Sequence, residues 1–518
     1  MGDYIKSVGA TFQQETTTSQ TSVMDTLQSS TLPTEDVVQG PTKMIATEPT
    51  SDLIHQSLHQ VPPSVVSGSG VYLTLSNGHQ ILDGCGGAAV AAIGHGNKEV
   101  QDAVMRQMSE VSYVNTLAYT TLSAERLASN LLSNNHTTRN GTNLDFSKVF
   151  FIGSGSEAMD TALKLARQYF VEKGEPQRKH IIARRQAYHG NTIGAMSVGS
   201  NLPRRAPYEG CYILPNVSFV SPPYTYRDQR ADESEEDYAN RLVTELDEEI
   251  QRVGPGEVIA FVAETQCGAT LACATAPRTY FQGIRRVCDK HGVLLILDEV
   301  MCGSGRSGTF FAFEQEGQDV HPDILTLGKG LGGGYAPIAA VMIREKVVDM
   351  LRQGSGGFVH AHTYQAHAVS CAAGLAVQEV VQKQDLLRKC VEMSRLLQSL
   401  VTEKLGEAKY VGDVRGRGLF WALELVKDKR TKETFDPKVG FGFRVKEEAQ
   451  KIGLAVYPGR GTVDGMRGDH VILAPPLTIT EEEMRLLVDR LVEAYRIVEK
   501  EVVTMMQAED LSEQGVIY

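Results

Sequence analysis

Short apolar runs that stop at a polar residue or a glycine recur through the middle of this 518-residue chain. They alternate with longer segments in which apolar positions repeat at helical spacing. Apolar runs of this length, bounded by glycine, are typical of strands whose two faces are both covered, as in a parallel sheet. The runs occupy residues 148–152, 179–183, 258–263, 293–297 and 324–327. Strands alternating with helices predict an α/β domain with a mainly parallel sheet.

The segments on either side of this alternation have other patterns. Residues 70–84 predict a hairpin, because Asn77-Gly78 supplies the positive φ angles of a tight turn. Towards the C-terminus, a strand segment at 412–425 and a long helix at 479–504 predict a smaller α+β domain. The predicted divisions are an N-terminal part of the small domain at 55–100, a large domain at 101–375 and a C-terminal small domain at 376–518.

Residues 1–54 differ in composition from everything that follows. They hold seventeen Ser or Thr residues and no Arg, and their apolar positions follow neither a helical nor a strand period over any sustained length. A segment this polar buries too little apolar surface to order itself, so we expect a disordered tail. Its seven acidic residues against two lysines argue against a transit peptide.

Composition narrows the class of protein further. The hydrophobic share of 42% and the charged share of 22% are ordinary for a soluble enzyme, and the length suggests more than one domain. The formal charge of −12 argues against nucleic-acid or anionic-membrane partners, and no apolar run is long enough to span a membrane. The eight cysteines are scattered without a CxxC pair, which favours reduced thiols in a cytoplasmic protein. We expect no metal site, since His360, His362 and His367 have no acidic ligand beside them.

Two of the apolar runs end near a reactive side chain. The run at 293–297 stops at Asp298, and the run at 324–327 is followed closely by Lys329 and a group of glycines. Ligands of parallel sheets sit beyond the carboxyl ends of the strands, so the carboxylate and the amine should face one crevice. A lysine there suggests a Schiff base to a carbonyl cofactor, and pyridoxal phosphate is the leading candidate.

A third run leads into Gly153-Ser154-Gly155-Ser156 and then a helix, an arrangement that binds phosphate through helix N-terminal amides. Gly153, Gly155 and Ala158 also satisfy a dinucleotide fingerprint. That alternative requires an acidic residue at the end of the next strand, which here ends in two arginines. A purely structural glycine turn is the other alternative. Tyr188, after that strand, could stack on a flat cofactor or belong to the core.

Together these segments resemble the class III pyridoxal-phosphate aminotransferases of fold type I. The resemblance covers roughly residues 60 to 500 and follows the family order. Its pieces are GSGSEAMDTALKLAR, YHG, AETQCGA, LLILDEVMCGSGRSG, PDILTLGKGLGGGY, HAHTYQAHAVSCAAGLA and GDHVILAPPLTIT. It implies a large domain with a mainly parallel sheet, a smaller α+β domain and bound pyridoxal 5′-phosphate.

The resemblance also implies a role for each matching residue. Lys329 forms the Schiff base to the cofactor, and Asp298 pairs with the pyridine nitrogen. Thr363 reaches the phosphate of the neighbouring subunit, which implies a homodimer with shared active sites. The other implied cofactor-binding residues are Gly155, Ser156, Tyr188, His189 and Val300.

The implied activity is a ping-pong transfer of an amino group from an amine, ω-amino or amino-acid donor to a keto acid or aldehyde. At the substrate end, Glu264 matches a glutamate that relatives acting on ω-amino acids pair with an arginine. Here Ile472 stands at the arginine's position, so carboxylate binding by that arginine is in doubt. Arg467 is the candidate for binding the keto acid instead. Gln266-Cys267 and Met301-Cys302 also depart from the commoner residues; the first pair could reshape the pocket, and the second disfavours decarboxylation.

Three alternatives stay open. The first is another pyridoxal-phosphate enzyme on the same scaffold, such as an amino-mutase, a decarboxylase or a phospho-lyase. The second is a nicotinamide-dependent oxidoreductase, and the third is a non-catalytic binding protein. A non-catalytic binding protein needs neither Lys329 nor Asp298, so the presence of both argues against the third alternative.

Overall fold

The computed structural model describes residues 51–134 and 145–513. The chain divides into two units, Met1–Pro62 and Pro63–Tyr518, and every described helix and strand belongs to the second. The predicted tail at 1–54 lies outside the described residues except for its last four. Within the described ranges, no helix has the length and apolar character needed to cross a membrane.

The largest sheet of the described chain has seven strands in the order β4-β10-β9-β8-β7-β5-β6. Strands β5 to β9 pair in parallel, whereas β10 runs antiparallel to both β4 and β9. The sheet is therefore mainly parallel, as predicted. Its strands are β4 Phe146–Ile152, β5 His180–Arg184, β6 Val217–Val220, β7 Val258–Glu264, β8 Leu294–Asp298, β9 Ile324–Leu327 and β10 Ala339–Arg344.

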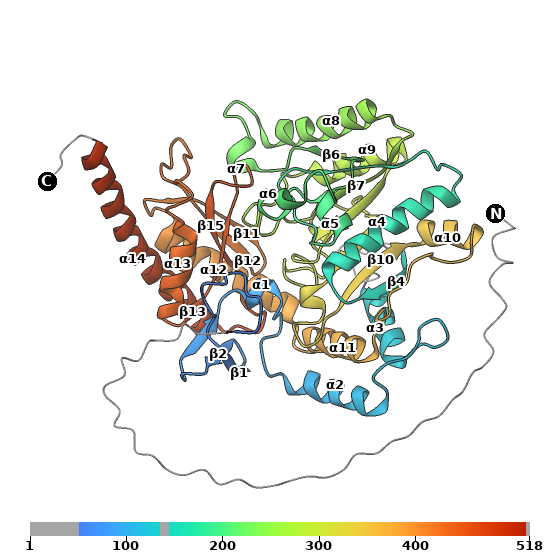
Figure 1. Ribbon diagram of the computed structural model, residues 1–518, viewed down its shortest axis with the longest axis horizontal. Helices are drawn as coiled ribbons and strands as arrows, with labels where there is room; N and C mark the ends of the chain where they lie inside the picture. The colour runs from blue at the N-terminus through green and yellow to red at the C-terminus, as the bar shows by residue number, and fades with distance from the viewer. Residues whose placement is uncertain (1–50, 135–144, 514–518) are drawn as a thin grey trace, which may run out of the picture. The chain divides into compact units, whose positions relative to one another are not determined.

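Helices cover both faces of this sheet, which explains why its strands read as continuous apolar runs. Side chains alternate between the faces, so Ile296 packs against one helical layer while its neighbour Leu295 packs against the other. One layer includes α4 and α10 (Figure 1), and the other includes α3, α8, α9 and α11. These helices are α3 Leu122–Asn134, α4 Gly155–Glu172, α8 Glu235–Val253, α9 Tyr280–His291, α10 Glu345–Gln353 and α11 Ala368–Lys383.

Two four-stranded sheets lie outside the central one. One joins the predicted hairpin to a short strand from the far end of the chain, and the other is antiparallel. The first contains β1 Val65–Ser69, β2 Tyr72–Leu75, β3 Gln80–Asp83 and β13 Leu454–Ala455, and the second contains β11 Val411–Arg417, β12 Phe420–Leu425, β14 Tyr457–Arg460 and β15 Asp469–Leu473. The long helices packed with them are α2 Lys98–Glu110, α12 Leu386–Leu405, α13 Phe441–Lys451 and α14 Glu481–Glu513.

Short helices complete the described chain. They are α1 Gly86–Ala89, α5 Ile193–Val198, α6 Leu202–Arg205 and α7 Thr225–Asp228, with single 3-10 turns at Ala206–Tyr208, Ala312–Gln315 and Lys329–Leu331. The last of these turns begins at the lysine that the sequence singles out, two residues beyond the end of the central strand β9.

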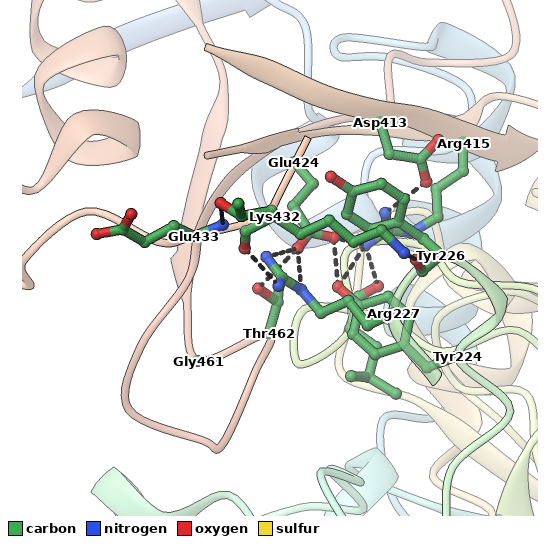
Figure 2. Close-up of polar contacts among 12 residues, drawn as sticks. Tyr224, Tyr226, Arg227, Asp413, Arg415, Glu424, Lys432, Glu433, Gly461 and Thr462 are labelled. Atoms are coloured by element: carbon green, nitrogen blue, oxygen red, sulfur yellow. Dashed lines mark hydrogen bonds and ion pairs between the residues drawn. The ribbon is translucent and has the colours of Figure 1, made fainter. Parts of the chain in front are cut away.

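A buried polar cluster joins the segment around α7 to strands β11 and β12 (Figure 2). The fully buried carboxylate of Glu424 lies at its centre. Arg227 Nε donates to Glu424 Oε1 at 2.6 Å, Arg415 Nη2 donates to Oε2 at 2.7 Å, and the Tyr224 hydroxyl donates to Oε2. The α7 segment, which connects strands of the central sheet, and strands β11 and β12 all meet at this one carboxylate. The cluster therefore links that connection to the antiparallel sheet.

Replacing Glu424 by glutamine is expected to lower the free energy of unfolding by about 3 to 5 kcal/mol, because the guanidinium group of Arg227 loses its carboxylate partner and that of Arg415 keeps only Asp413. Burial raises the pKa of Glu424, but the charges of Arg415 and Arg227 outweigh burial, and the pKa lies below its usual value. Such a group stabilises the fold above its unfolded pKa, and this contribution is lost as pH falls through the folded pKa.

In urea unfolding experiments, the stability difference between the wild type and Glu424→Gln should therefore shrink as the pH falls below about 4.3. Glu433→Gln, which removes an exposed carboxylate paired with Lys427, is the matched control and should change stability little. Equal stability of Glu424→Gln and the wild type at neutral pH would contradict the prediction.

Candidate active site

A cavity of about 310 Å³ lies at the carboxyl ends of the central strands. Strands β7 and β8 end in register, with Glu264 opposite Asp298, and both side chains line the cavity. Lys329, two residues beyond β9, lines it too. The loops that follow β4 and β5 line the cavity as well. Strand β4 ends at the same edge of the sheet because it runs in the same direction as β9. The predicted crevice between the carboxylate and the amine therefore exists.

Asp298 is held by contacts on both carboxylate oxygens. Its Oδ2 lies 2.8 Å from His189 Nδ1, while Oδ1 accepts hydrogen bonds from Val300 N at 3.0 Å and from Thr326 Oγ1 at 3.3 Å. Its residue exposure is 6%, and the His189 side chain is fully buried. A carboxylate fixed in this way presents its charge to the cavity in one orientation.

Lys329 adopts a left-handed backbone conformation with φ of 41°. A residue other than glycine pays about 1 kcal/mol or more for this region, so the surrounding structure holds the lysine in place. Burial lowers the pKa of its amine, although the nearby Asp298 and Glu264 carboxylates oppose that effect. A larger share of the amine is therefore uncharged at neutral pH than for an ordinary lysine.

The N-terminus of α4 faces the same cavity through Gly155 and Ser156. Ser154 caps the helix by accepting a hydrogen bond from Glu157 N at 3.3 Å. The N–H groups of the first helical turn have no acceptor inside the helix, so this end can bind an anion. Gly155 has no room for a side chain, because an added Cβ would lie 2.6 Å from Val300 Cγ1. Only glycine lets Val300 approach the helix start this closely.

Tyr188 is half-buried and lines the cavity beside His189. Its backbone N donates to Glu264 Oε1 at 3.2 Å, so the tyrosine and the glutamate hold each other at the cavity wall. The guanidinium of Arg204 lies over the Tyr188 ring, 5.4 Å from the ring centre. Burial raises the pKa of the Tyr188 hydroxyl, which keeps the ring uncharged.

Two residues that the sequence assigns to the site lie outside this cavity. Thr363 is exposed and lines a separate hollow of about 590 Å³, which shares Gly153 with the cavity wall. Arg467 is a surface residue whose side chain is 58% exposed, and its Nε pairs with Asp464 Oδ2 at 2.7 Å. Neither reaches the cavity of its own chain in this arrangement.

Sequence reasoning missed Tyr457 at the substrate end. Tyr457 lines the cavity from β14, where it pairs with Ile472 on β15. Ile472 is buried in an apolar cluster with Ala269 and Met301, both of which line the cavity. Only the three-dimensional pairing of β14 with β15 brings Tyr457 here. The replacement of arginine by Ile472 was visible in the sequence, and its apolar surroundings now explain it.

The residues around the cavity fit a flat, phosphorylated heteroaromatic aldehyde. Lys329 offers an amine to the aldehyde, the start of α4 offers amides to the phosphate, and Asp298 offers a charge to a ring nitrogen. Val300 occupies the space that a side chain at Gly155 would need, so the start of α4 packs directly against Val300, which also lines the cavity.

Comparisons with known proteins agree with this chemistry. The family model for class III aminotransferases matches residues 54–495. An uncharacterized aminotransferase of Schizosaccharomyces pombe is 47% identical over 442 residues, covering 85% of this chain and 93% of that protein. A putrescine–pyruvate aminotransferase of Pseudomonas aeruginosa is 34% identical over 426 residues, covering 82% of this chain and 88% of that protein.

A solved structure is similar over the same extent. The pyridoxal-phosphate-bound amine transaminase from an uncultivated Pseudomonas species matches with a TM-score of 0.80 at 32% identity, covering 87% of this chain and 100% of that chain. The two chains therefore share a fold, at a sequence identity that supports common descent. The chain therefore belongs to the class III aminotransferases, a family that uses pyridoxal phosphate.

Proposed function

We propose that this aminotransferase moves the amino group of an amine or ω-amino donor to a keto acid or aldehyde by a ping-pong mechanism. The observation that carries the proposal is the meeting of Asp298, Lys329 and the start of α4 in one cavity. An apolar substrate end around Met301 and Ile472 favours amine-type donors over donors that carry a carboxylate beside the amine.

The cofactor-binding roles follow from the groups at the cavity wall. The N–H groups of Gly155 and Ser156 would hold the phosphate at the positive end of the helix dipole. Asp298 would face the pyridine nitrogen, and His189 would hold the carboxylate in that orientation. Tyr188 and Val300 would contact the ring.

When bound, the cofactor supplies an electron sink for the electron pair released as the donor's C–H bond breaks. Asp298 keeps a proton on the ring nitrogen by its negative charge. Lys329 would take the proton from the donor carbon as general base and pass it to the cofactor carbon that bears the transferred amino group, a task for which its lowered pKa suits it. The apolar wall excludes water from the reacting atoms.

The direct test mixes the holoenzyme with single amine donors while its visible absorption is followed, and then adds pyruvate. Bleaching by an amine, recovery with pyruvate and formation of alanine are the expected results. Release of carbon dioxide, inorganic phosphate or a rearranged amine in place of alanine would instead identify another reaction on the same scaffold. The protein lacks this function if no amine changes the visible band.

We also propose a homodimer with shared active sites, located in the cytoplasm. Support for an interface comes from exposed large apolar side chains, some of which contact each other, such as Tyr113 and Tyr364 at 6.0 Å between ring centres. The others in the same two segments are Met105, Met108, Val111, Leu117, Tyr119, Leu122 and Val359. The cytoplasmic location is supported by eight free cysteines, seven of them buried.

If Thr363 binds the cofactor phosphate in the active site of the neighbouring subunit, a hybrid dimer made from one inactive and one weakened subunit should regain activity. Thr363→Ala homodimers should bind pyridoxal phosphate about 10- to 100-fold more weakly, because a hydrogen bond to a charged group is lost. A hybrid of Lys329→Ala and Thr363→Ala subunits would contain one site with both residues intact. Differently tagged subunits purified as hybrids should therefore show about half of wild-type activity at limiting cofactor, by simple counting of sites. Hybrids as weak as the Thr363→Ala homodimer would place Thr363 in its own subunit's site.

Arg467→Ala is expected to raise the KM for the keto acid about tenfold or more with little change in kcat, because Arg467 would leave Asp464 to bind the acceptor's carboxylate. Initial rates at varied pyruvate measure this effect. Arg485→Ala is the matched control, since Arg485 is an exposed arginine paired with Glu481 on α14. An unchanged KM for pyruvate in Arg467→Ala would remove this residue from the site.

A further inference from the structure

The guanidinium of Arg204 lies over the ring of Tyr188 at the edge of the cavity. Its Cζ is 5.4 Å from the ring centre, within the range at which a cation is attracted to the face of an aromatic ring. Tyr188 lines the cavity and Arg204 does not, so the arginine contacts the ring from outside the cavity. The tyrosine ring therefore stands between the guanidinium and the cavity.

No other group competes with this ring for the charge of Arg204. The residue is exposed, and among the described residues its guanidinium makes no hydrogen bond and no ion pair. A surface arginine usually pairs with a carboxylate or is held by water alone. Within the described part of the chain, the ring of Tyr188 is its one specific partner.

The short helix α6, which carries Arg204, is anchored on two sides. The next residue along the chain, Arg205, donates from Nη1 to Gly199 O at 2.8 Å, which ties the helix to the segment after α5. On another side Leu202 packs against the loop after β14, where a Cβ added to Gly465 would lie 3.2 Å from Leu202 Cγ. These contacts fix the backbone from which the Arg204 side chain reaches the ring.

The charge of Arg204 also acts on the groups inside the cavity. Burial raises the pKa of the Tyr188 hydroxyl and lowers that of the Lys329 amine, and the charge of Arg204 acts to lower both. A nearby positive charge disfavours the protonated form of an amine, so Arg204 adds to the uncharged share of Lys329. The arginine therefore belongs electrostatically to the cavity although it does not line it.

We propose that Arg204 is a positioning residue whose guanidinium holds the ring of Tyr188 against the pyridine ring of the cofactor. This inference rests on the proposed function, which places Tyr188 at that ring. Attraction between the cation and the ring restricts the rotation of a side chain that is only half-buried. A tyrosine already held in place loses less conformational freedom when the cofactor binds, and binding is tighter as a result.

Pyridoxamine 5′-phosphate tests the proposal, because it has the ring and phosphate of the cofactor but carries an amine in place of the aldehyde. It cannot become attached to Lys329, so calorimetric titration of the apoenzyme reports the non-covalent contacts alone. Arg204→Met, which keeps an apolar stem and removes the charge, should bind it about 3- to 10-fold more weakly. Arg204→Lys, which returns a cation to the ring, should recover most of the loss. Arg496→Met is the control and should bind like the wild type, since it removes a guanidinium 5.6 Å from the ring centre of Tyr495 on α14.

A second variant shows whether the effect of the arginine passes through the tyrosine. Tyr188→Leu removes the ring, so adding Arg204→Met to it should weaken binding no further. The visible circular dichroism of bound pyridoxal phosphate, per molecule bound, reports how the site holds the cofactor ring. This signal should change in the same direction in Arg204→Met and in Tyr188→Leu.

The outcomes separate this inference from the proposed function. Wild-type affinity in Arg204→Met, or an equal loss with and without the Tyr188 ring, overturns the positioning role. A raised KM for pyruvate in Arg204→Met with unchanged affinity for pyridoxamine phosphate overturns it too, and assigns the guanidinium to the acceptor. Wild-type affinity in Tyr188→Leu refutes the proposed contact between this tyrosine and the cofactor, and the inference with it.

Discussion

Lys329→Ala is expected to lower kcat for transamination about a thousandfold or more while leaving the fold intact. General-base catalysis by a positioned side chain is worth about 10²- to 10⁴-fold, and the lysine also supplies the covalent attachment of the cofactor. Within the described part of the chain, no second lysine lines the cavity, so none can replace it. Stopped-flow absorbance with a saturating donor measures the loss directly.

Two comparisons sharpen this experiment. Lys329→Arg keeps a positive charge that cannot be removed at neutral pH, so it should be as inactive as Lys329→Ala if proton transfer is the role. Lys98→Ala, an exposed lysine on α2, should keep wild-type activity. Because burial lowers the pKa of Lys329, the acid limb of the pH profile for kcat should lie below the ordinary pKa of lysine. This profile reports the enzyme–donor complex, in which the lysine amine is free, and activity should be lost as that amine gains its proton. Full turnover by Lys329→Ala would refute the assignment.

Asp298→Asn is expected to lower kcat about 10²- to 10³-fold, the size of effect seen when one preorganised electrostatic contact is removed from an active site. Asparagine preserves the shape of the side chain and can keep contacts with His189, Val300 and Thr326. What it loses is the negative charge that would hold a proton on the ring nitrogen. Asp298→Asn therefore tests the charge of the carboxylate more than its packing.

The visible spectrum of Asp298→Asn loaded with cofactor should shift together with the rate, since a change in ring protonation alters the chromophore. Circular dichroism confirms that the variant is folded. Asp289→Asn removes an exposed aspartate on α9 and should leave both rate and spectrum unchanged. A rate for Asp298→Asn within about threefold of wild type would rule out this role, because one lost electrostatic contact should cost far more.

Much of the central sheet could be predicted because its strands are buried on both faces. An apolar run such as 293–297 must be a covered strand or a helix, and its shortness and bounding polar residues favour the strand. The structure places β8 at Leu294–Asp298, within one residue of the prediction. Strand β10 was not predicted, although Ala339–Arg344 is also largely apolar. Its antiparallel place between β4 and β9 depends on pairing across the sheet, which periodicity does not contain.

The cofactor end of the site was predictable for a related reason. Asp298 and Lys329 stand close to the ends of neighbouring strands, so local pattern and one rule of sheet topology place them together. Tyr457 reaches the same cavity through a separate sheet, and Ile472 packs behind its wall; no local signal reveals that approach. The position of Arg467 depends on the loop after β14, whose surface conformation is set by its pairing with Asp464.

The parallel pairing of β3 with β13 has a consequence for biosynthesis. Leu82 pairs with Leu454, so the first strand leaves the ribosome about 370 residues before its partner, a delay of about 20 to 70 seconds at usual elongation rates. During that interval Ile81 and Leu82, both buried in the finished protein, have no neighbouring strand on that side. The cavity wall is also incomplete until Tyr457 has been made. A nascent chain therefore leaves this apolar strand edge open to aggregation until β13 is made, and a chain truncated before β13 is expected to lack part of the cavity wall.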